Sequence, residues 1–261
     1  MKNKTALITG ASSGIGLELA KLHASKGGNL VLVARNKIIL DKLKLELEKQ
    51  YNISVYTISK DLSDPDAAKE VYNETALHSI PIDYLINNAG FGDFGMFYET
   101  DWNKEYKMIN LNIIALTQFT KLYLKDMISR KGGKIMNLAS TAAFQPGPEM
   151  AVYFATKAYV LSFSEAVNNE VHGKGITITA LCPGMTKSGF QAAASLEESK
   201  TVKGKKLPTS KEVAIYGYDA MMKGKTVAIH GVLNNIIANS VRFMPRAFVV
   251  NLTGKIMEKA L

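Results

Sequence analysis

Short apolar and β-branched runs alternate along the whole chain with longer stretches of helical spacing. Seven of these runs have the length and composition of strands, and they cover residues 5–9, 30–34, 54–58, 84–87, 134–138, 176–181 and 226–229. Between them, apolar side chains recur at helical intervals, as at Ile39, Leu43 and Leu47. Repeated strand–helix–strand units predict a parallel sheet of about seven strands covered by helices on both faces, the doubly wound, Rossmann-type α/β architecture.

No linker or low-complexity segment interrupts this pattern, so we expect residues 1–261 to form a single domain. Residues 187–208 contain no clear strand and carry a polar run, which is typical of a flap. Thr209 and Glu212 have the spacing of a capping box and predict that a helix begins there. Residues 232–261 form two amphipathic helical stretches that Pro245 separates.

The bulk composition excludes few functions. A single cysteine, Cys182, excludes an intramolecular disulfide and is typical of a reducing compartment. The first strand starts too early to leave room for a signal peptide, and no apolar run approaches a membrane span of about 20 residues, so we expect a cytoplasmic location. The net charge of +9 comes from scattered lysines, which favours a solvated surface that attracts an anionic cofactor over a nucleic-acid interface.

A glycine-rich turn joins the first strand to the first helix. It contains Gly10, Gly14 and Gly16 in the spacing Gly-x3-Gly-x-Gly. Glycine allows a tight turn and a close approach to a pyrophosphate, and the helix that follows directs free N–H groups at the phosphates. We therefore expect a dinucleotide to contact Gly10, Ser12, Ser13, Gly14, Ile15 and Gly16.

The residues at the end of the second predicted strand indicate which dinucleotide the protein binds. An acidic residue here would bind the adenosine ribose of NAD, but no Asp or Glu occurs between Asn29 and Leu40. Arg35 stands there instead and can pair with the 2′-phosphate of NADP(H), which we predict as the cofactor. Asp61 and Leu62, after the third strand, are expected beside the adenine.

Tyr153 and Lys157 lie one helical turn apart and share a face of a predicted helix. A tyrosine with a pKa of about 10 is a poor base, and we expect the neighbouring ammonium to lower that pKa. Ser140 ends the fifth predicted strand and can reach the same crevice, because ligands gather at the carboxyl ends of parallel strands. No histidine is placed to activate this serine as in a hydrolase, and no metal ion is predicted.

In order and spacing, these motifs resemble the short-chain dehydrogenase/reductase family. The resemblance rests on residues 9–16, Asn87-Asn88-Ala89-Gly90, Ser140, Tyr153-x3-Lys157 and residues 182–186, and it extends over about residues 4–230. It implies that Tyr153 exchanges the proton with a carbonyl oxygen, that Ser140 binds that oxygen and that Lys157 holds the nicotinamide ribose. Asn110 would position a water that links Lys157 to solvent.

The resemblance also implies further cofactor contacts. Asn88, Ala89 and Gly90 would flank the adenosine ribose, and Pro183, Gly184 and Thr186 would meet the nicotinamide. Ser13 and Arg35 occupy positions that favour NADP in the family.

Apolar residues next to the motifs predict an apolar carbonyl or alcohol substrate. The expected lining is Phe91, Phe94, Ala142, Phe144, Met150, Met185 and Phe190. We predict an NADPH-preferring oxidoreductase that forms a homo-oligomer, either a dimer or a tetramer, and does not bind nucleic acid. The alternatives are a peripheral-membrane reductase of lipids or acyl chains, whose tail docks on a bilayer, and a non-catalytic nucleotide sensor. The tail is expected to pack on protein, in its own subunit or across a dimer, and to shape the substrate pocket.

Overall fold

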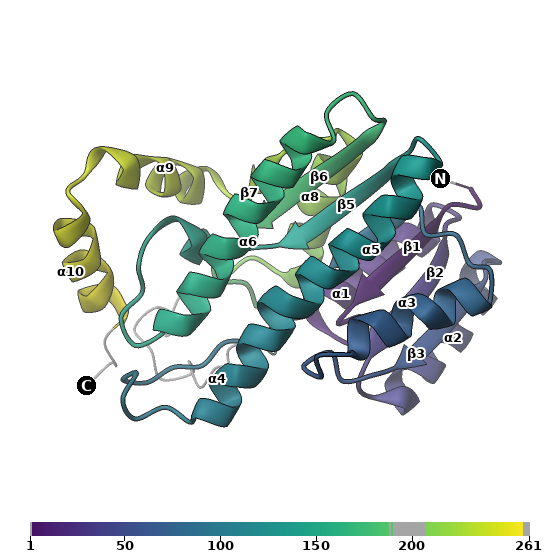
Figure 1. Cartoon of the computed structure of the whole chain (residues 1–261), viewed down its shortest axis with the longest axis horizontal. Helices are drawn as coiled ribbons and strands as arrows, with labels where there is room; N and C mark the ends of the chain where they lie inside the picture. The colour runs from purple at the N-terminus through teal and green to yellow at the C-terminus, as the bar shows by residue number, and fades with distance from the viewer. Residues whose placement is uncertain (1, 188, 190–206, 258–261) are drawn as a thin grey trace.

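The computed structural model describes residues 2–187, 189 and 207–257. Its centre is a seven-stranded parallel sheet in the order β3-β2-β1-β4-β5-β6-β7 (Figure 1). The strands are β1 Thr5–Thr9, β2 Asn29–Ala34, β3 Val55–Ser59, β4 Tyr84–Asn87, β5 Gly133–Leu138, β6 Ile176–Cys182 and β7 Val227–Ile229. The predicted doubly wound architecture is confirmed, and every strand boundary lies within one residue of its expected position.

Helices cover both faces of the sheet (Figure 1). They are α1 Gly14–Ser25, α2 Lys37–Tyr51, α3 Ala67–Leu77, α4 Trp102–Ile109, α5 Leu116–Ser129, α6 Ala151–Glu170, α8 Ser210–Met222, α9 Val232–Ser240 and α10 Arg246–Met257. Three shorter helical segments are η1, a π-helical turn over Asn110–Ala115, and the 3₁₀ turns η2 Thr141–Phe144 and η3 Val241–Phe243.

Residues 30–34 of strand β2 are all apolar, without the alternation of polar and apolar residues that a strand with one exposed face shows. Leu30 and Leu32 pack into a core with residues of α1, α2 and α8, whereas Val31 and Val33 pack into a second core with residues of α3 and α5. Because successive side chains of a strand point to opposite faces, both sets must be apolar when helices cover both faces.

The order of the strands creates the crevice that a ligand can enter. The chain moves outward from β1 to β2 and β3, and then returns to place β4 on the other side of β1. Connections from β1 and β4 therefore leave in opposite directions, and their carboxyl ends diverge at the topological switch point. This is the edge where the glycine-rich turn and residues 88–90 lie.

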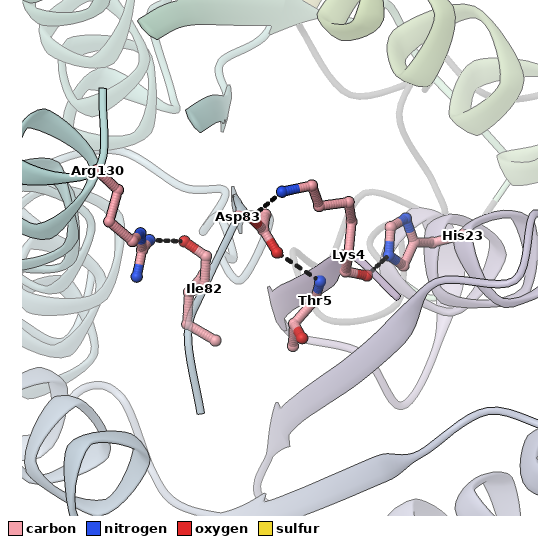
Figure 2. Close-up of polar contacts among 6 residues, drawn as sticks. All are labelled: Lys4, Thr5, His23, Ile82, Asp83 and Arg130. Atoms are coloured by element: carbon pink, nitrogen blue, oxygen red, sulfur yellow. Dashed lines mark hydrogen bonds and ion pairs between the residues drawn. The ribbon is translucent and has the colours of Figure 1, made fainter. Parts of the chain in front are cut away.

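Polar contacts hold the opposite, amino-terminal edge of the sheet together (Figure 2). The Asp83 carboxylate accepts hydrogen bonds from the backbone N–H of Thr5 and from Lys4 Nζ, both at 2.9 Å. Arg130, at the end of α5, donates to the carbonyl of Ile82 at 2.6 Å. These contacts connect β1, the start of β4 and α5 at a distance from the crevice.

The flap and the tail follow the sixth strand. Most of the predicted flap lies outside the described residues, but its ends meet where the Lys187 N–H donates to the Pro208 carbonyl at 2.8 Å. The capping box of Thr209 and Glu212 is confirmed at the start of α8. The tail forms α9 and α10, with Pro245 between them, and both helices lie together at one end of the molecule (Figure 1). None of the described helices combines the length and the apolar character that crossing a membrane requires.

Candidate active site

A cavity of about 880 Å³ opens at the carboxyl ends of the strands. Its wall combines the turn after β1, the ends of β2, β4, β5 and β6, one face of α6 and the two tail helices. The sequence-predicted residues that line it are Gly10, Ser12, Ser13, Gly14, Ile15, Arg35, Asp61, Leu62, Asn88, Ala89, Gly90, Ser140, Tyr153, Lys157, Pro183, Gly184 and Thr186. One continuous cavity thus brings the predicted cofactor-binding and catalytic groups together.

The glycine-rich turn is too tightly packed to accept side chains. Gly10 has a φ of +67°, and a Cβ on Gly16 would lie 2.4 Å from both the Gly10 carbonyl oxygen and Asn88 Nδ2. The Asn88 amide donates to the Thr9 carbonyl at 2.9 Å, so the β1 turn and the β4 turn are joined directly. This cradle of backbone at the start of α1 fits the pyrophosphate of a dinucleotide.

Basic residues surround the end of the cavity next to β2. Arg35 is exposed there and lines the wall, while Asn36 caps α2 by accepting a hydrogen bond from the Ile39 N–H at 3.1 Å. Lys107 on α4 also lines the cavity, close enough to Asp61 to interact with its carboxylate. Lys107 is not among the residues predicted from the sequence, because nothing in the α4 pattern indicates that this helix approaches the end of β3.

Helix α6 presents Tyr153 and Lys157 to the cavity, and both are almost completely buried. Lys157 Nζ lies 5.7 Å from the centre of the Tyr153 ring and donates to the Leu138 carbonyl at 2.7 Å. A side-chain hydrogen bond joins Ser140 to Tyr153. Ser140 is itself oriented by the Ala142 N–H, which donates to its hydroxyl oxygen at 3.1 Å. The three predicted catalytic side chains therefore form one cluster.

The protonation of this cluster differs from the sequence-based expectation. Burial raises the pKa of Tyr153 to about 12, although the hydrogen bond to Ser140 opposes the shift. Burial also lowers the pKa of Lys157 to about 8. The prediction of a lowered tyrosine pKa is wrong for this structure, because burial removes the phenolate from water and this effect exceeds the lowering by Ser140. Tyr153 is thus held as a neutral phenol, which is a proton donor.

Two asparagines in the π-helical turn η1 lie behind the cluster. Asn110 is buried, and its Nδ2 has no hydrogen-bond partner in the described part of the chain. A buried amide without a partner is costly, so this atom suits the ordered water that the family resemblance implies. Asn112, which the sequence analysis missed, is fully buried and donates to the Phe91 carbonyl at 3.0 Å and to Thr156 Oγ1 at 3.1 Å.

The predicted substrate residues divide into three groups. Phe91, Ala142, Met150 and Met185 line the cavity. Phe94 and Phe144 are not among its lining residues, and they pack instead against the cores around Tyr153 and Val160. Phe190 lies outside the described residues. Local sequence proximity to a motif could not separate these groups, since the direction of each side chain depends on the turns that follow β4 and β5.

The tail contributes a second apolar wall. Side chains between α9 and the end of α10 line the cavity, and they include Ile237, Val241, Met244, Val249, Leu252, Ile256 and Met257. Three tail residues, Ala238, Val249 and Met257, are buried against the rest of the chain. The tail therefore packs on its own subunit along its inner side and extends the apolar part of the cavity.

A nucleotide-binding crevice beside a Ser–Tyr–Lys cluster defines an oxidoreductase that uses a nicotinamide dinucleotide. The family model for short chain dehydrogenases matches residues 4–199, and the chain belongs to this family. It is accordingly an NAD(P)-dependent enzyme that interconverts carbonyl and alcohol groups. The sequence-based predictions of the family and of this reaction class are confirmed.

Known relatives and solved structures agree with this assignment. The human very-long-chain 3-oxoacyl-CoA reductase is 29% identical over 252 residues, which cover 95% of this chain and 78% of the human protein. A short-chain dehydrogenase from Sphingobium yanoikuyae in complex with NADPH has a TM-score of 0.83 and 30% identity, with 92% and 94% of the two chains covered. The bulky-bulky ketone specific alcohol dehydrogenase from Comamonas testosteroni has a TM-score of 0.79 and 30% identity, with 93% of each chain covered.

The match does not extend over the whole length of every relative. Several other very-long-chain 3-oxoacyl-CoA reductases are aligned over only 54–58% of their own length. The family and its chemistry are therefore shared, whereas the substrate must be inferred from the cavity.

Proposed function

We propose that this protein is an NADPH-preferring reductase of a ketone on an apolar molecule, with Tyr153 as the proton donor. The observation that carries this proposal is the composition of the cavity at the carboxyl ends of the strands. Its middle holds Ser140, Tyr153 and Lys157, and its far end is lined by Met150, Met185 and the apolar tail side chains. A carbonyl that reaches the cluster would leave its apolar substituents against that wall.

The chemistry can be divided between the bound dinucleotide and the residues of the chain. NADPH, when bound, supplies the hydride that reduces the carbonyl carbon. Ser140 donates a hydrogen bond to the carbonyl oxygen, and Tyr153 Oη gives that oxygen the proton that completes the alcohol. The phenolate left on Tyr153 is stabilised by the Lys157 ammonium, and the tyrosine regains its proton before the next turnover. The raised pKa of Tyr153 keeps its side chain in the proton-donor form at neutral pH, which is the form that reduction requires.

The preference for NADPH rests on the end of β2. Arg35 is exposed at the cavity wall, and no carboxylate on the loop after β2 competes for the adenosine ribose. A guanidinium pairs with a phosphate in bidentate fashion, so the 2′-phosphate of NADPH has a fitting partner. The complex of the Sphingobium yanoikuyae relative with NADPH supports the same preference.

A 3-oxoacyl thioester is the second candidate substrate. The tail helices extend the apolar wall, which suits an acyl chain, and the human relative is named as a very-long-chain 3-oxoacyl-CoA reductase. A bulky ketone, as in the name of the Comamonas testosteroni relative, suits the same wall. The predicted homo-oligomer and the cytoplasmic location stay predictions.

Replacing the proton donor tests the proposed mechanism. Tyr153→Phe should lower kcat for ketone reduction by about 10²–10⁴-fold and leave the Kd for NADPH within about twofold, because only the hydroxyl is removed. Tyr159→Phe is the matched control, since Tyr159 lies on the same helix, is partly exposed and bonds to Thr117. If the kcat of the Tyr153→Phe variant lies within tenfold of the wild-type value, Tyr153 is not the proton donor.

A substrate series separates the two substrate classes. NADPH oxidation would be measured with 3-oxoacyl thioesters from four to eighteen carbons (about one assay per two carbons) and with aryl ketones of matched size. An acyl substrate should show kcat/KM rising with chain length, as each buried methylene contributes about 0.8 kcal/mol. A higher kcat/KM for the aryl ketones than for the thioesters would indicate that the substrate is a bulky ketone.

A further inference from the structure

Several large apolar side chains of the tail are exposed. Val232, Leu233 and Ile236 of α9 are 80%, 69% and 60% exposed, and Phe243 of η3 is 89% exposed. Phe248 of α10 is also more than half exposed. Isolated exposed apolar residues are ordinary, but five within seventeen residues form a concentration that indicates an interaction surface. We refer to these five residues, with Arg242 and Arg246, as the tail face.

The charged side chains in the described part of the tail, residues 232–257, all have one sign. Arg242, Arg246 and Lys255 are exposed, and no Asp or Glu occurs in the sequence between Asp219 and Glu258. Some exposed lysines elsewhere have a carboxylate partner, such as Lys37 with Asp41 at 2.7 Å. Arg242, Arg246 and Lys255 form no ion pair with any described residue. The tail face therefore combines apolar side chains with cations that have no carboxylate partner among the described residues.

This combination favours a lipid surface over a second copy of the chain. A symmetric contact between two tail faces would place Arg242 and Arg246 of both copies in one interface to which the tail face supplies no carboxylate, and the like charges would repel one another. An anionic bilayer provides an apolar interior for Leu233 or Phe243 and phosphates for the arginines. We propose that the tail face docks onto the surface of bilayers that contain anionic phospholipids.

The docking surface adjoins the mouth of the cavity. Ile237, Leu252 and Ile256 line the cavity, yet each is between 43% and 50% exposed, so the apolar wall is continuous with the outside of the tail. An apolar substrate in the bilayer could therefore reach Tyr153 along side chains of the tail without full exposure to water. This consequence rests on the proposed function, whereas the docking itself does not.

Vesicle flotation with the full chain tests the docking. Vesicles of phosphatidylcholine alone are compared with vesicles in which about a third of the lipid is phosphatidylglycerol, at low and high salt. The protein should float with the anionic vesicles at low salt and should bind less at high salt. Arg242→Gln combined with Arg246→Gln should weaken binding by about thirtyfold. Leu233→Ser combined with Phe243→Ser should weaken binding at both salt concentrations.

Helix α2 offers matched controls. Leu45 is 67% exposed, and Lys42 and Lys49 are exposed on the same helix. Leu45→Ser and the Lys42→Gln, Lys49→Gln pair make equivalent changes outside the tail face and should leave vesicle binding unchanged. Thermal unfolding and NADPH binding, which do not depend on lipid, would establish that each variant is folded.

Three results would overturn the proposal. The first is no binding of the wild type to anionic vesicles, and the second is equal weakening by the α2 controls. The third is a lipid-free dimer, measured by light scattering, that the Leu233→Ser, Phe243→Ser pair converts to a monomer, since the tail face would then be a protein interface. All three readouts are independent of catalysis, so a failed ketone assay would not be mistaken for failed docking.

Discussion

Asn112 Nδ2 donates a hydrogen bond to Thr156 Oγ1 at 3.1 Å and so joins the π-helical turn η1 to the catalytic helix α6. Thr156 in turn contacts the catalytic residue, because its hydroxyl donates a hydrogen bond to the Tyr153 carbonyl at 2.7 Å. The same asparagine bonds to both backbone groups of Phe91, which follows the predicted cofactor contacts at residues 88–90. Asn112 thus fixes the position of α6 relative to the turn after β4.

Replacing Asn112 should impair catalysis by displacing the catalytic side chains of α6. Asn112→Leu keeps the volume but removes the hydrogen bonds to Phe91 and Thr156, and kcat/KM should fall by about tenfold to a hundredfold as the cluster moves. The pH profile of kcat should change as well, since Tyr153 and Lys157 lose their fixed separation.

A second asparagine controls for a loss of stability alone. Asn168 makes a comparable set of bonds, to the Ile178 N–H at 2.8 Å and to Thr226 at 3.0 Å, but it does not line the cavity. Asn168→Leu should lower the free energy of unfolding by about 1–3 kcal/mol and leave the pH profile of kcat unchanged. If Asn112→Leu behaves in the same way as Asn168→Leu, Asn112 has only a structural role.

The lowered pKa of Lys157 predicts how reduction depends on pH. Burial brings this pKa to about 8, whereas Tyr153 stays protonated to about pH 12. The ammonium that stabilises the phenolate is therefore lost first, and kcat/KM with NADPH varied should fall as the pH rises through about 8. The pH profile of kcat/KM is the informative measurement, because it reports the pKa values of groups in the free enzyme.

Lys157→Arg should keep its charge above pH 10 and lose that descending limb, whatever its absolute activity. Lys134→Arg is the control, since burial also lowers the pKa of Lys134 but this residue does not line the cavity. A wild-type profile that stays flat to pH 10 would contradict the assignment to Lys157.

Exchanging the charge at Arg35 should change the choice of cofactor. Arg35→Asp removes the partner of the 2′-phosphate and supplies an acceptor for the ribose hydroxyls of NADH. The ratio of kcat/KM for NADPH to that for NADH should fall by about a hundredfold or more, given that charged hydrogen bonds contribute about 1.5–3 kcal/mol each. Lys37→Asp makes the same charge change two residues away, outside the cavity, and should alter the ratio little. A wild type that already prefers NADH would refute the role of Arg35.

Buried His23 should make the fold sensitive to acid. Its Nε2 lies 3.0 Å from the Lys4 carbonyl, to which it must donate, so Nδ1 accepts from the Tyr218 hydroxyl at 2.8 Å (Figure 2 shows the contact to Lys4). This arrangement requires the neutral ring, and burial holds the pKa of His23 below its ordinary value of 6.5.

The unfolded chain then binds the extra proton more readily, and stability falls as the pH drops below about 6.5. The loss attributable to His23 is at most about 1.4 kcal/mol per pH unit. Urea unfolding between pH 7.5 and 5 should show a shallower pH dependence for His23→Gln than for the wild type. His172→Gln, at an exposed histidine, should keep the wild-type dependence. Equal slopes for His23→Gln and the wild type would exclude His23 as the acid-sensitive group.

The sequence by itself determined the features that depend on local periodicity. The seven strands, the capping box of Thr209 and Glu212, and the pairing of Tyr153 with Lys157 on one helix face all follow from spacing along the chain. The parallel orientation of the strands also follows, because strand–helix–strand units pack in few ways. The glycine-rich turn was recognisable since only glycine adopts its backbone and tolerates its contacts.

Only the tertiary structure decided the features that depend on burial and on distance through space. The pKa of Tyr153 rises because α6 and its neighbours remove the phenol from water, which no spacing of residues reveals. Lys107 and Asn112 reach the site from α4 and η1 because those elements cross the ends of the strands, and Phe94 and Phe144 pack away from the cavity. Each tail helix likewise has one apolar face in sequence. Only the packing determines that Ile237 and Leu252 line the cavity while Leu233 and Phe248 stay largely exposed, since burial depends on the surface that each side chain meets.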